Sequence, residues 1–437
     1  MHDVVVVGGG IAGLSAAWSL RELDVVVLEA SDRPGGRIRS ERRGRYWLNL
    51  GAHVFAGPGT PTDRLLREAE VEAVPIPGVL TAVELHGRVV AGGRVETYPL
   101  RLPLRLPERV ALVRAGLRLR RAVSRYDRVL RTGDQEQVLA FMADETFAHW
   151  LGPVPDAVDA LIRPTLQRSS AEPEELAAGY GIGYFHLVWD RSGGLARALL
   201  GGPSSLPEAI AASLGERVRT GVRVREVVAD GGGVRVESDG GELRARCAVL
   251  AVPAHATLAL APGLPAETAA ALRQVVYGPY VVAAFLTRET SPAPWDGLYA
   301  VATARRSFNL LINTANVVHA REERRAPGGS LMAYSAARLA RRLSDADDAE
   351  VAAAYLEDLD GVFPGAGDLV EETVVHRWEH GLPYVRPGRY RVQRTLEQPL
   401  GNVFLAGDYL GSRYTDTAIR TGTAAAEAIR ARIGPRV

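Results

Sequence analysis

Three glycines near the N-terminus have the spacing that lets a backbone approach a phosphate. Gly8, Gly10 and Gly13 fit the pattern G-x-G-x-x-G. The first glycine permits a tight turn, the second lets the backbone approach a pyrophosphate, and the third lets a helix pack closely on a strand. Glu29 lies about 20 residues after the central glycine, where a carboxylate can accept a hydrogen bond from a ribose hydroxyl. These residues predict a site for a dinucleotide with an unphosphorylated ribose, which is NAD or FAD.

One ionisable side chain lies in an otherwise apolar and glycine-rich stretch, WLNLGAHVFAGPG. This side chain is His53. A histidine can act near neutral pH as a base, as a proton carrier or as a hydrogen-bond donor. The alternative is a packed histidine with satisfied ring nitrogens and no chemical role. The stretch by itself leaves both interpretations open.

Hydrophobic patterning predicts the elements that must position the glycines and the acid. Residues 4–7 are a continuous β-branched run, which is typical of a strand buried on both faces. Residues 12–21 are rich in small side chains and predict a helix, and residues 25–28 predict a second strand that ends at the acid. Ile11 and Ala12 then lie at the helix N-terminus, where free N–H groups and the helix dipole favour phosphate.

The sequence after the second strand resembles the signature of a known family. EASDRPGGRIRS, residues 29–40, is similar to the E-A-x-x-R-x-G-G-R pattern of the flavin amine oxidase superfamily, which includes amine oxidases, protoporphyrinogen oxidases and carotenoid-type desaturases. The resemblance selects FAD over NAD. It implies that the two glycines bring the backbone near the FAD diphosphate and that the arginines balance its charge, with a solvated polar turn as the alternative. The cofactor-binding residues expected here are Ala30, Arg33, Gly35, Gly36 and Arg37.

Two segments near the C-terminus match later parts of the same family pattern. NVFLAGDYL predicts a short strand that ends at Gly407 and Asp408, which in the family contact the ribityl-diphosphate part of FAD. The helix that follows matches the last helix of the family, whose N-terminus points at the flavin pyrimidine. Its start matches Thr417, Ala418 and Ile419, and its dipole would stabilise negative charge on the reduced flavin.

The middle of the chain predicts the strands that complete the cofactor domain. Residues 217–255 alternate between apolar and polar side chains and contain glycine-rich turns, which is typical of a β-meander. The resemblance implies that Val224 corresponds to a valine whose backbone pairs with the adenine. Cys247, in the last of these strands, is interpreted as a buried core residue.

The resemblance also implies a substrate position in front of the flavin. Amine oxidases of the family flank their substrate with two aromatic rings, which suit a desolvated amine. Tyr414 matches one of the two positions, with packing over the last helix as its alternative role. The other position falls at Gly381, so Trp378 or Tyr384 is expected to replace it.

The chain contains arginine but no lysine, so no lysine can act as a base or as a partner of the flavin. Amine oxidases of the family hold a lysine near flavin N5 through a water. The resemblance therefore implies a dehydrogenase, a desaturase or a protoporphyrinogen-oxidase-like enzyme rather than one that activates oxygen by that device. HGLPYVRPG, residues 380–388, is closer to the desaturase and porphyrinogen oxidase pattern and contains no cysteine, so the FAD is expected to be noncovalent.

The family places a turn beside the isoalloxazine ring shortly after its G-G-R motif. Asn49 and Gly51 match this turn, so Gly51, Ala52 and His53 join the expected cofactor site. The pattern G-x-H-x-F also resembles sugar-nucleotide mutases, which use reduced flavin without net redox. His53 and Tyr414 are therefore the predicted catalytic residues, with structural packing as the alternative for each.

These features predict an FAD-dependent oxidoreductase that transfers a hydride from a C–N or C–C bond of a small organic substrate to flavin N5, in pigment, porphyrin or specialised metabolism. The first alternative is a non-redox isomerase or mutase that uses reduced FAD. The second is a non-catalytic flavoprotein escort. No metal is expected, because the sequence contains no zinc-spacing pattern.

The order of the matching segments predicts an α/β chain with two interleaved domains. A Rossmann-type, glutathione-reductase-like FAD-binding domain is expected to be interrupted twice by an α+β substrate-binding domain. The expected FAD-binding segments are 1–80, 203–271 and 388–437, and the expected substrate-binding segments are 81–202, mainly helical, and 272–387. Within the first insertion, residues 134–151 predict one helix.

Composition indicates the cellular context. The net charge is +1, which predicts no nucleic-acid partner. The N-terminus begins with a strand rather than a leader peptide, no apolar run approaches ~18 residues, and the single cysteine excludes an internal disulfide. We therefore expect a cytoplasmic monomer or homodimer that acts on a small molecule.

Residues 101–131 are strongly basic, with ten arginines against Glu108 and Asp127. They can form a membrane-surface patch or an entrance for an anionic substrate. A solvated helix face in an arginine-rich protein is the favoured interpretation, because no large aromatic anchors accompany the charges. Membrane contact is thus considered but not favoured.

Overall fold

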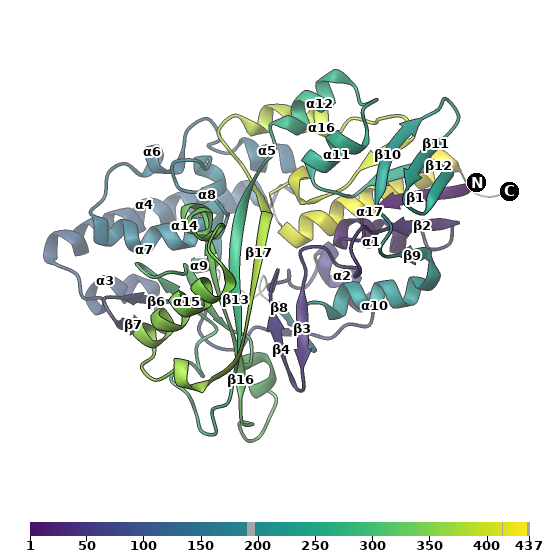
Figure 1. Ribbon diagram of the computed structural model, residues 1–437. Coiled ribbons are helices and arrows are strands. Elements are labelled where there is room, and N and C mark those ends of the chain that lie inside the picture. The colour runs from purple at the N-terminus through teal and green to yellow at the C-terminus, as the bar shows by residue number, and fades with distance from the viewer. Residues whose placement is uncertain (190–196, 413, 435–437) are drawn as a thin grey trace.

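The computed structural model describes residues 1–189, 197–412 and 414–434. Parts of the expected segments 81–202 and 388–437 therefore lie outside the described residues. Within the described residues, two seven-stranded sheets carry most of the β-structure (Figure 1). The first sheet has the order β10-β11-β12-β1-β2-β9, with β18 beside β12. Its strands are β1 (His2–Val7), β2 (Val25–Leu28), β9 (Val218–Arg219), β10 (Val224–Ala229), β11 (Val234–Ser238), β12 (Gly241–Leu250) and β18 (Val403–Leu405).

The parallel part of the first sheet joins segments from both ends of the chain. β1 pairs in parallel with β2 and with β12, and β12 pairs in parallel with β18. The β-branched runs of β1 and β2 are buried, as expected for strands covered on both faces. β10, β11 and β12 form the predicted antiparallel meander, with Cys247 buried in β12. The Rossmann-type fold is confirmed.

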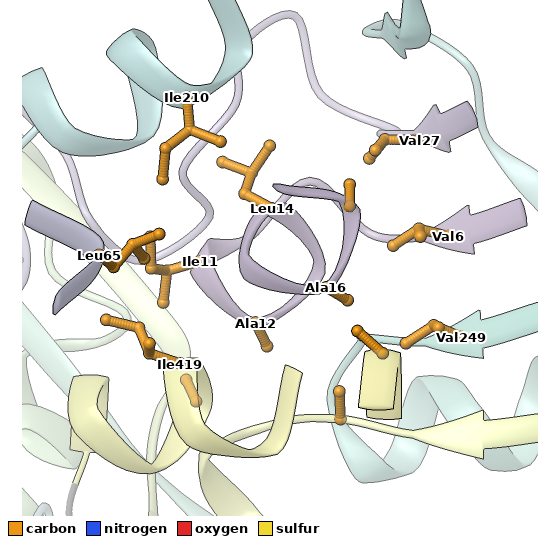
Figure 2. Packing of buried hydrophobic residues seen from close by; sticks show 14 of the residues in the cluster. Val6, Ile11, Ala12, Leu14, Ala16, Val27, Leu65, Ile210, Val249 and Ile419 are labelled. Carbon is orange, nitrogen blue, oxygen red and sulfur yellow. The ribbon is translucent and has the colours of Figure 1, made fainter. Parts of the chain in front are cut away.

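Helix α1 (Ile11–Ser19) forms the centre of the core beside this sheet. Figure 2 shows that the strand residues Val6 and Val249 lie on one side of α1. The helix residues Ile210 and Ile419 lie on two other sides of it. The helices around it are α2 (Pro61–Glu68), α10 (Ser205–Leu214) and α17 (Tyr414–Ile433).

Glycines let the backbones in this core approach closely. A β-carbon at Gly13 would lie 2.0 Å from the carbonyl oxygen of Gly8, and one at Gly422 would lie 2.1 Å from the carbonyl oxygen of Ala12. No other residue type fits at these contacts. The first turn of α1 is therefore held between the turn after β1 and the last helix of the chain.

The second sheet has the order β17-β13-β16-β15-β14-β6-β7. Its strands are β6 (Ala82–Leu85), β7 (Arg88–Val90), β13 (Val276–Thr287), β14 (Ala300–Thr303), β15 (Leu310–Asn313), β16 (Gly329–Ala336) and β17 (Val370–Tyr384). One face is covered by α14 (Ala337–Leu343) and α15 (Asp348–Val362). On that face the apolar side chains of α15, including Tyr355, pack against those of β13, including Phe285.

The other face of the second sheet packs against the N-terminal segment. Leu48 and Leu50 form one buried cluster with Val282 of β13 and Ile312 of β15. This contact fixes the turn that follows β4 (Tyr46–Asn49) between the two sheets.

Shorter elements connect the parts of the fold. They are β3 (Ser40–Arg43), β4, β5 (Ala73–Pro75), β8 (Arg197–Leu199), α11 (Ala254–Leu260), α12 (Ala266–Arg273), α13 (Asn316–His319) and α16 (Gln393–Leu396).

A group of helices extends from the second sheet toward the end of the molecule opposite the N-terminus (Figure 1). They are α3 (Tyr98–Arg101), α4 (Leu106–Leu130), α5 (Gln135–Ala140), α6 (Phe147–Leu151), α7 (Asp156–Gln167), α8 (Ala178–Tyr184) and α9 (His186–Trp189). Among the helices described, none has the length and apolar character needed to cross a membrane.

The prediction of one helix over residues 134–151 is wrong. The chain forms α5 and α6 instead, separated by residues 141–146. The Thr146 hydroxyl accepts a hydrogen bond from the His149 N–H at 3.2 Å and so starts a new helix. A β-carbon at Gly179 of α8 would lie 1.6 Å from the carbonyl oxygen of Phe141, so α8 crosses directly at the break. Tertiary packing overrides the local helical pattern here.

Candidate active site

The turn after β1 leaves open space in front of its central glycine. A β-carbon at Gly10 would meet no atom within 4 Å, and Gly10 caps α1 without a side-chain hydrogen bond. Gly36 lies against it, because a β-carbon there would be 3.3 Å from the Gly10 Cα, and the Gly35 N–H donates to the Gly9 carbonyl at 2.8 Å. Two glycine loops thus border an open helix N-terminus, and these residues fit the pyrophosphate of FAD.

Glu29 lies beside this opening at the end of β2. Its carboxylate accepts hydrogen bonds from the Gly9 N–H at 2.6 Å, the Ser31 N–H at 2.8 Å and the Ser31 hydroxyl at 2.7 Å. A carboxylate offers about four acceptor positions, so one remains for a ribose hydroxyl. The Val222 N–H donates to the Glu29 carbonyl at 2.9 Å, so the chain leading into Val224 passes this acid. The adenine contact of Val224 stays a prediction.

Arg37 and Asp408 meet from distant parts of the chain. Arg37 Nη2 donates to Asp408 Oδ1 at 2.9 Å, and Nη1 donates to the Gly381 carbonyl at 3.0 Å. Burial lowers the pKa of Arg37, but Asp408 together with Tyr277 and Tyr280 outweighs burial, so the pKa is raised overall. The preceding Gly407 N–H donates to the Thr421 hydroxyl of α17 at 3.0 Å. Arg37 keeps further N–H donors for a diphosphate, although Asp408 already balances its charge.

Arg33 holds the glycine loop from within. Its guanidinium donates to the backbone carbonyls of Pro34 and Ile38, both at 3.1 Å, and of Gly36 at 2.8 Å. Burial lowers its pKa. These bonds fix the shape of the loop that contains Gly36. The N–H groups that form them point at the backbone, whereas a diphosphate would need donors that point away from it. Ala30, at the start of the loop, is exposed.

The turn after β4 packs directly on the same loop. The Ala52 N–H donates to the Arg37 carbonyl at 3.1 Å, and a β-carbon at Gly51 would lie 2.2 Å from that oxygen. The side chain of Asn49 supports the turn by donating to the Gly51 carbonyl at 3.2 Å. Glycine is required at this contact because any side chain would separate the two loops. The next residue of the turn is His53.

His53 lies against two aromatic residues, Tyr334 of β16 and Tyr299 directly before β14. The centroid of its ring is 6.4 Å from the ring centroids of both Tyr299 and Tyr334. Burial, and then the positive charge of Arg168, lowers the pKa of His53 to about 4, against a backbone hydrogen bond at Gly51 that raises it. The imidazole is therefore neutral at pH 7, where it can donate or accept a hydrogen bond.

Tyr414, the other predicted catalytic residue, begins α17 and packs against a tyrosine of α8. Its ring meets that of Tyr184 edge to face, with the centroids 5.7 Å apart. The residue is 37% exposed, so part of its surface is accessible to a ligand.

A tyrosine of β13 packs on Gly381, the residue at the second expected aromatic position. A β-carbon at Gly381 would lie 2.4 Å from the ring of Tyr280. The expected substitutes are engaged elsewhere: Trp378 Nε1 donates to the Leu50 carbonyl at 2.6 Å, and Tyr384 belongs to the core of the helical group. The sequence signal for Tyr280 is weak, since it depends on a register shift between β13 and β17.

The first turn of α17 is held by α2. Thr417, Ala418 and Ile419 are buried. Asp416 accepts hydrogen bonds from the Thr62 N–H at 3.2 Å and from its hydroxyl at 2.8 Å. This carboxylate therefore helps to cap the start of α2. The flavin contact of the first turn of α17 stays a prediction.

Arg168 is a candidate residue that sequence reasoning missed. It is the C-cap of α7, and its backbone carbonyl accepts a hydrogen bond from the Tyr280 hydroxyl at 2.5 Å. Its charge also acts on His53 and Tyr414. Nothing in the local sequence distinguishes it from the other arginines, because its position depends on how α7 packs against the second sheet.

The family model of the flavin containing amine oxidoreductases matches residues 11–430. Coproporphyrinogen III oxidase of Mycobacterium bovis is 27% identical over 439 residues, which cover 93% of this chain and 92% of that protein. Probable flavin-containing monoamine oxidase A of Dictyostelium discoideum is 25% identical over 277 residues, so the match spans only 58% of that relative. Cyclohexylamine oxidase from Brevibacterium oxydans IH-35A has the same fold, with a TM-score of 0.81 at 22% identity over 99% of both chains. The protein belongs to the family of flavin-containing amine oxidoreductases, and its cofactor is FAD.

Proposed function

We propose that the protein is a dehydrogenase that removes a hydride from a C–N or C–C bond of a small organic substrate. The observation that carries the proposal is the pair of glycine loops that border an open helix N-terminus, in a chain whose residues 11–430 match the family model. Tyr414 is partly exposed and Tyr280 packs on Gly381, so these two rings are the candidates to flank a substrate. FAD, when bound, accepts the hydride.

The surrounding phenols act as neutral partners of the substrate. Burial raises the pKa of Tyr280, Tyr299 and Tyr334, so each hydroxyl keeps its proton at neutral pH. Their rings exclude water and restrict the orientations that a flat substrate can adopt. The protein's contribution to hydride removal is then mainly the alignment of the reacting C–H bond.

His53 and Arg168 favour a substrate without positive charge at its reacting centre. The guanidinium of Arg168 is a cation that would repel an ammonium group, and the imidazole of His53 is neutral at pH 7 and supplies no counter-charge. A substrate amine would therefore react in its neutral form, whose nitrogen lone pair assists loss of hydride from the neighbouring carbon. His53 would accept or donate a hydrogen bond to that group.

The absence of lysine favours an electron acceptor other than oxygen. The mycobacterial relative is named coproporphyrinogen III oxidase, and its match extends over nearly the whole chain. Together these observations support the C–C alternative, with a porphyrinogen or another reduced pigment precursor as the substrate.

Anaerobic mixing of the FAD-loaded protein with amines, reduced porphyrins and partly saturated polyenes tests the proposal. We expect bleaching of the flavin absorbance by at least one class, with formation of the dehydrogenated product. Conversion by the pre-reduced protein without net electron transfer would instead establish an isomerase. The absence of turnover in both flavin states, together with tight binding of another protein, would establish an escort.

A further inference from the structure

Exposed large apolar side chains gather on one short stretch of the described chain. Residues 100–117 contain five of them, and the others are Met1, Leu80 and Tyr414. One of the five, Leu100, belongs to α3, and the other four lie on α4 at positions i, i+4, i+7 and i+11, which share one face of a helix. These four form what we call the apolar stripe: Leu106, Val110, Val113 and Leu117, with 74%, 42%, 45% and 51% of their surface exposed.

The opposite face of α4 is buried in the core of the helical group. Ala115, Leu119 and Val123 pack there with Val158 of α7 and Ile182 of α8. The helix is therefore apolar on two faces, and the core accounts for only one of them. An amphipathic surface helix turns its second face to water with polar side chains, so the apolar stripe needs another explanation.

Arginines border the apolar stripe on both edges. At the helical repeat of 3.6 residues, Arg109 and Arg120 lie along one edge, and Arg114 and Arg121 lie along the other. Arg120 has a carboxylate within reach, that of Glu96 at 3.4 Å. Arg114 and Arg121 are exposed and form no ion pair with any residue that the structure describes.

The two acidic side chains of α4 are engaged elsewhere. Glu108 accepts a hydrogen bond from the Arg105 N–H at 2.7 Å and so caps the start of the helix. Asp127 is hydrogen bonded to the ring of His186 at 2.5 Å. The outer face of α4 is therefore apolar along its centre and cationic along both edges.

A bilayer surface with anionic lipids complements both features of this face. The apolar side chains can enter the interface while the arginines reach the lipid phosphates. The apolar stripe extends for about 17 Å along α4, which suits a helix that lies in the plane of the interface. A second copy of the chain fits less well, because a symmetric pairing of two stripes would bring cationic edges together in either orientation.

We infer that α4 docks the protein on an anionic membrane surface through the apolar stripe and the arginines beside it. The docked face belongs to the helical group, and the first sheet with its glycine loops lies toward the other end of the molecule (Figure 1). The inference goes beyond the proposed function, because it does not depend on the reaction. It replaces the solvated face favoured from the sequence, which does not reveal which apolar side chains of α4 stay outside the core.

Co-sedimentation of the FAD-loaded protein with vesicles tests the docking surface. At low salt the native protein should sediment with vesicles that contain phosphatidylglycerol and not with pure phosphatidylcholine. Added salt should weaken the binding, because it screens the arginines from the lipid phosphates. Absence of binding to the anionic vesicles at low salt would overturn the inference.

Two double substitutions separate the apolar contribution from the charge. L106S/L117S should reduce binding several-fold although every arginine remains. R114Q/R121Q should reduce it about 10-fold or more, because each basic side chain near an anionic surface contributes roughly 5-fold. R114K/R121K keeps the charge and should keep most of the binding. All four side chains are exposed, so these variants should retain FAD and the native thermal stability.

Matched controls lie outside α4. L80S removes another exposed leucine, and R324Q/R342Q removes two other exposed arginines, so both should bind vesicles nearly as the native protein does. Loss of binding in R324Q/R342Q equal to that in R114Q/R121Q would indicate attraction without a docking face and would overturn the inference. Native binding by L106S/L117S, or a native dimer that this variant abolishes, would overturn it as well.

Discussion

The guanidinium of Arg37 and the carboxylate of Asp408 lie 2.9 Å apart although 371 positions separate them in the chain. The Asp408 side chain is only 8% exposed. This contact joins the glycine loop of the N-terminal segment to the turn that precedes α17. The contact therefore connects a loop of the expected cofactor site to the segment that adds β18 to the first sheet.

Replacement of Arg37 by alanine should destabilise the protein and weaken FAD binding. A buried carboxylate without its partner costs about 3 kcal/mol or more, so the free energy of unfolding of the apo-protein should fall by that order. Urea denaturation of R37A, D408A and the double variant would measure it as a double-mutant cycle. Additive effects of the two single changes would contradict a direct coupling.

Two alanine substitutions in the glycine turn should have opposite consequences. G10A places a methyl group in open space, so the apo-protein should fold with nearly native stability but bind FAD poorly. G13A forces a β-carbon to 2.0 Å from the Gly8 carbonyl, so it should disrupt folding. Thermal unfolding and FAD fluorescence on the two variants provide the comparison. Normal FAD affinity in G10A would show that the pyrophosphate does not approach this glycine.

Replacement of His53 by alanine should leave FAD bound and remove most turnover. Because its pKa is about 4, we expect kcat/KM to show no His53 ionisation between about pH 5.5 and 8. H53Q should restore part of the activity if a hydrogen bond is all that is needed. Full activity in H53A would leave only a packing role for this residue.

Acid should destabilise the native apo-protein more than it destabilises H53Q. The folded-state pKa of His53 lies near 4, below the ordinary value of 6.5, so the unfolded chain binds a proton first as the pH falls. Stability is therefore lost between pH 6.5 and 4. His376 also has a pKa lowered to about 4 by burial, so H53Q should keep part of the slope. Denaturation at several pH values would measure the difference, and identical slopes would contradict it.

The rings of Tyr280 and Tyr414 should matter more than their hydroxyls. Y280F and Y414F keep the flanking surfaces, whereas Y280A and Y414A remove them, so the alanine variants should lose roughly 5- to 10-fold more in kcat/KM. Steady-state kinetics with the substrate identified by flavin bleaching would check this. If phenylalanine and alanine have equal effects at Tyr414, its hydroxyl carries the role instead.

The cofactor side of the site follows from local sequence, because each signal there is a backbone requirement. Gly13 must be glycine to let α1 meet β1, and Gly51 must be glycine to let its turn meet the Arg37 carbonyl. Because these positions must be glycine, the glycines occur at fixed spacings in the sequence and can be recognised without a structure. The interior of the first sheet was predictable for the same reason, since burial on both faces demands continuous β-branched runs.

The substrate side could not be predicted in the same way. Arg168 is placed by the packing of α7 against β14, and Tyr280 by the pairing of β13 with β17, and neither residue stands in a recognisable motif. The break after α5 has the same origin, since the close approach of Gly179 to Phe141 involves residues far apart in the sequence. Contacts between remote segments decide all three features, and periodicity along one segment does not report them.

The contact between Gly422 and Ala12 has a consequence for biosynthesis. β18 and α17 complete the first sheet and its core, so the cofactor domain cannot close until residues 403–433 have left the ribosome. The second sheet and the helical group are synthesised earlier and can fold first. A nascent chain therefore carries an open glycine turn until residues 403–433 have been synthesised, and stable flavin binding is expected only after that point.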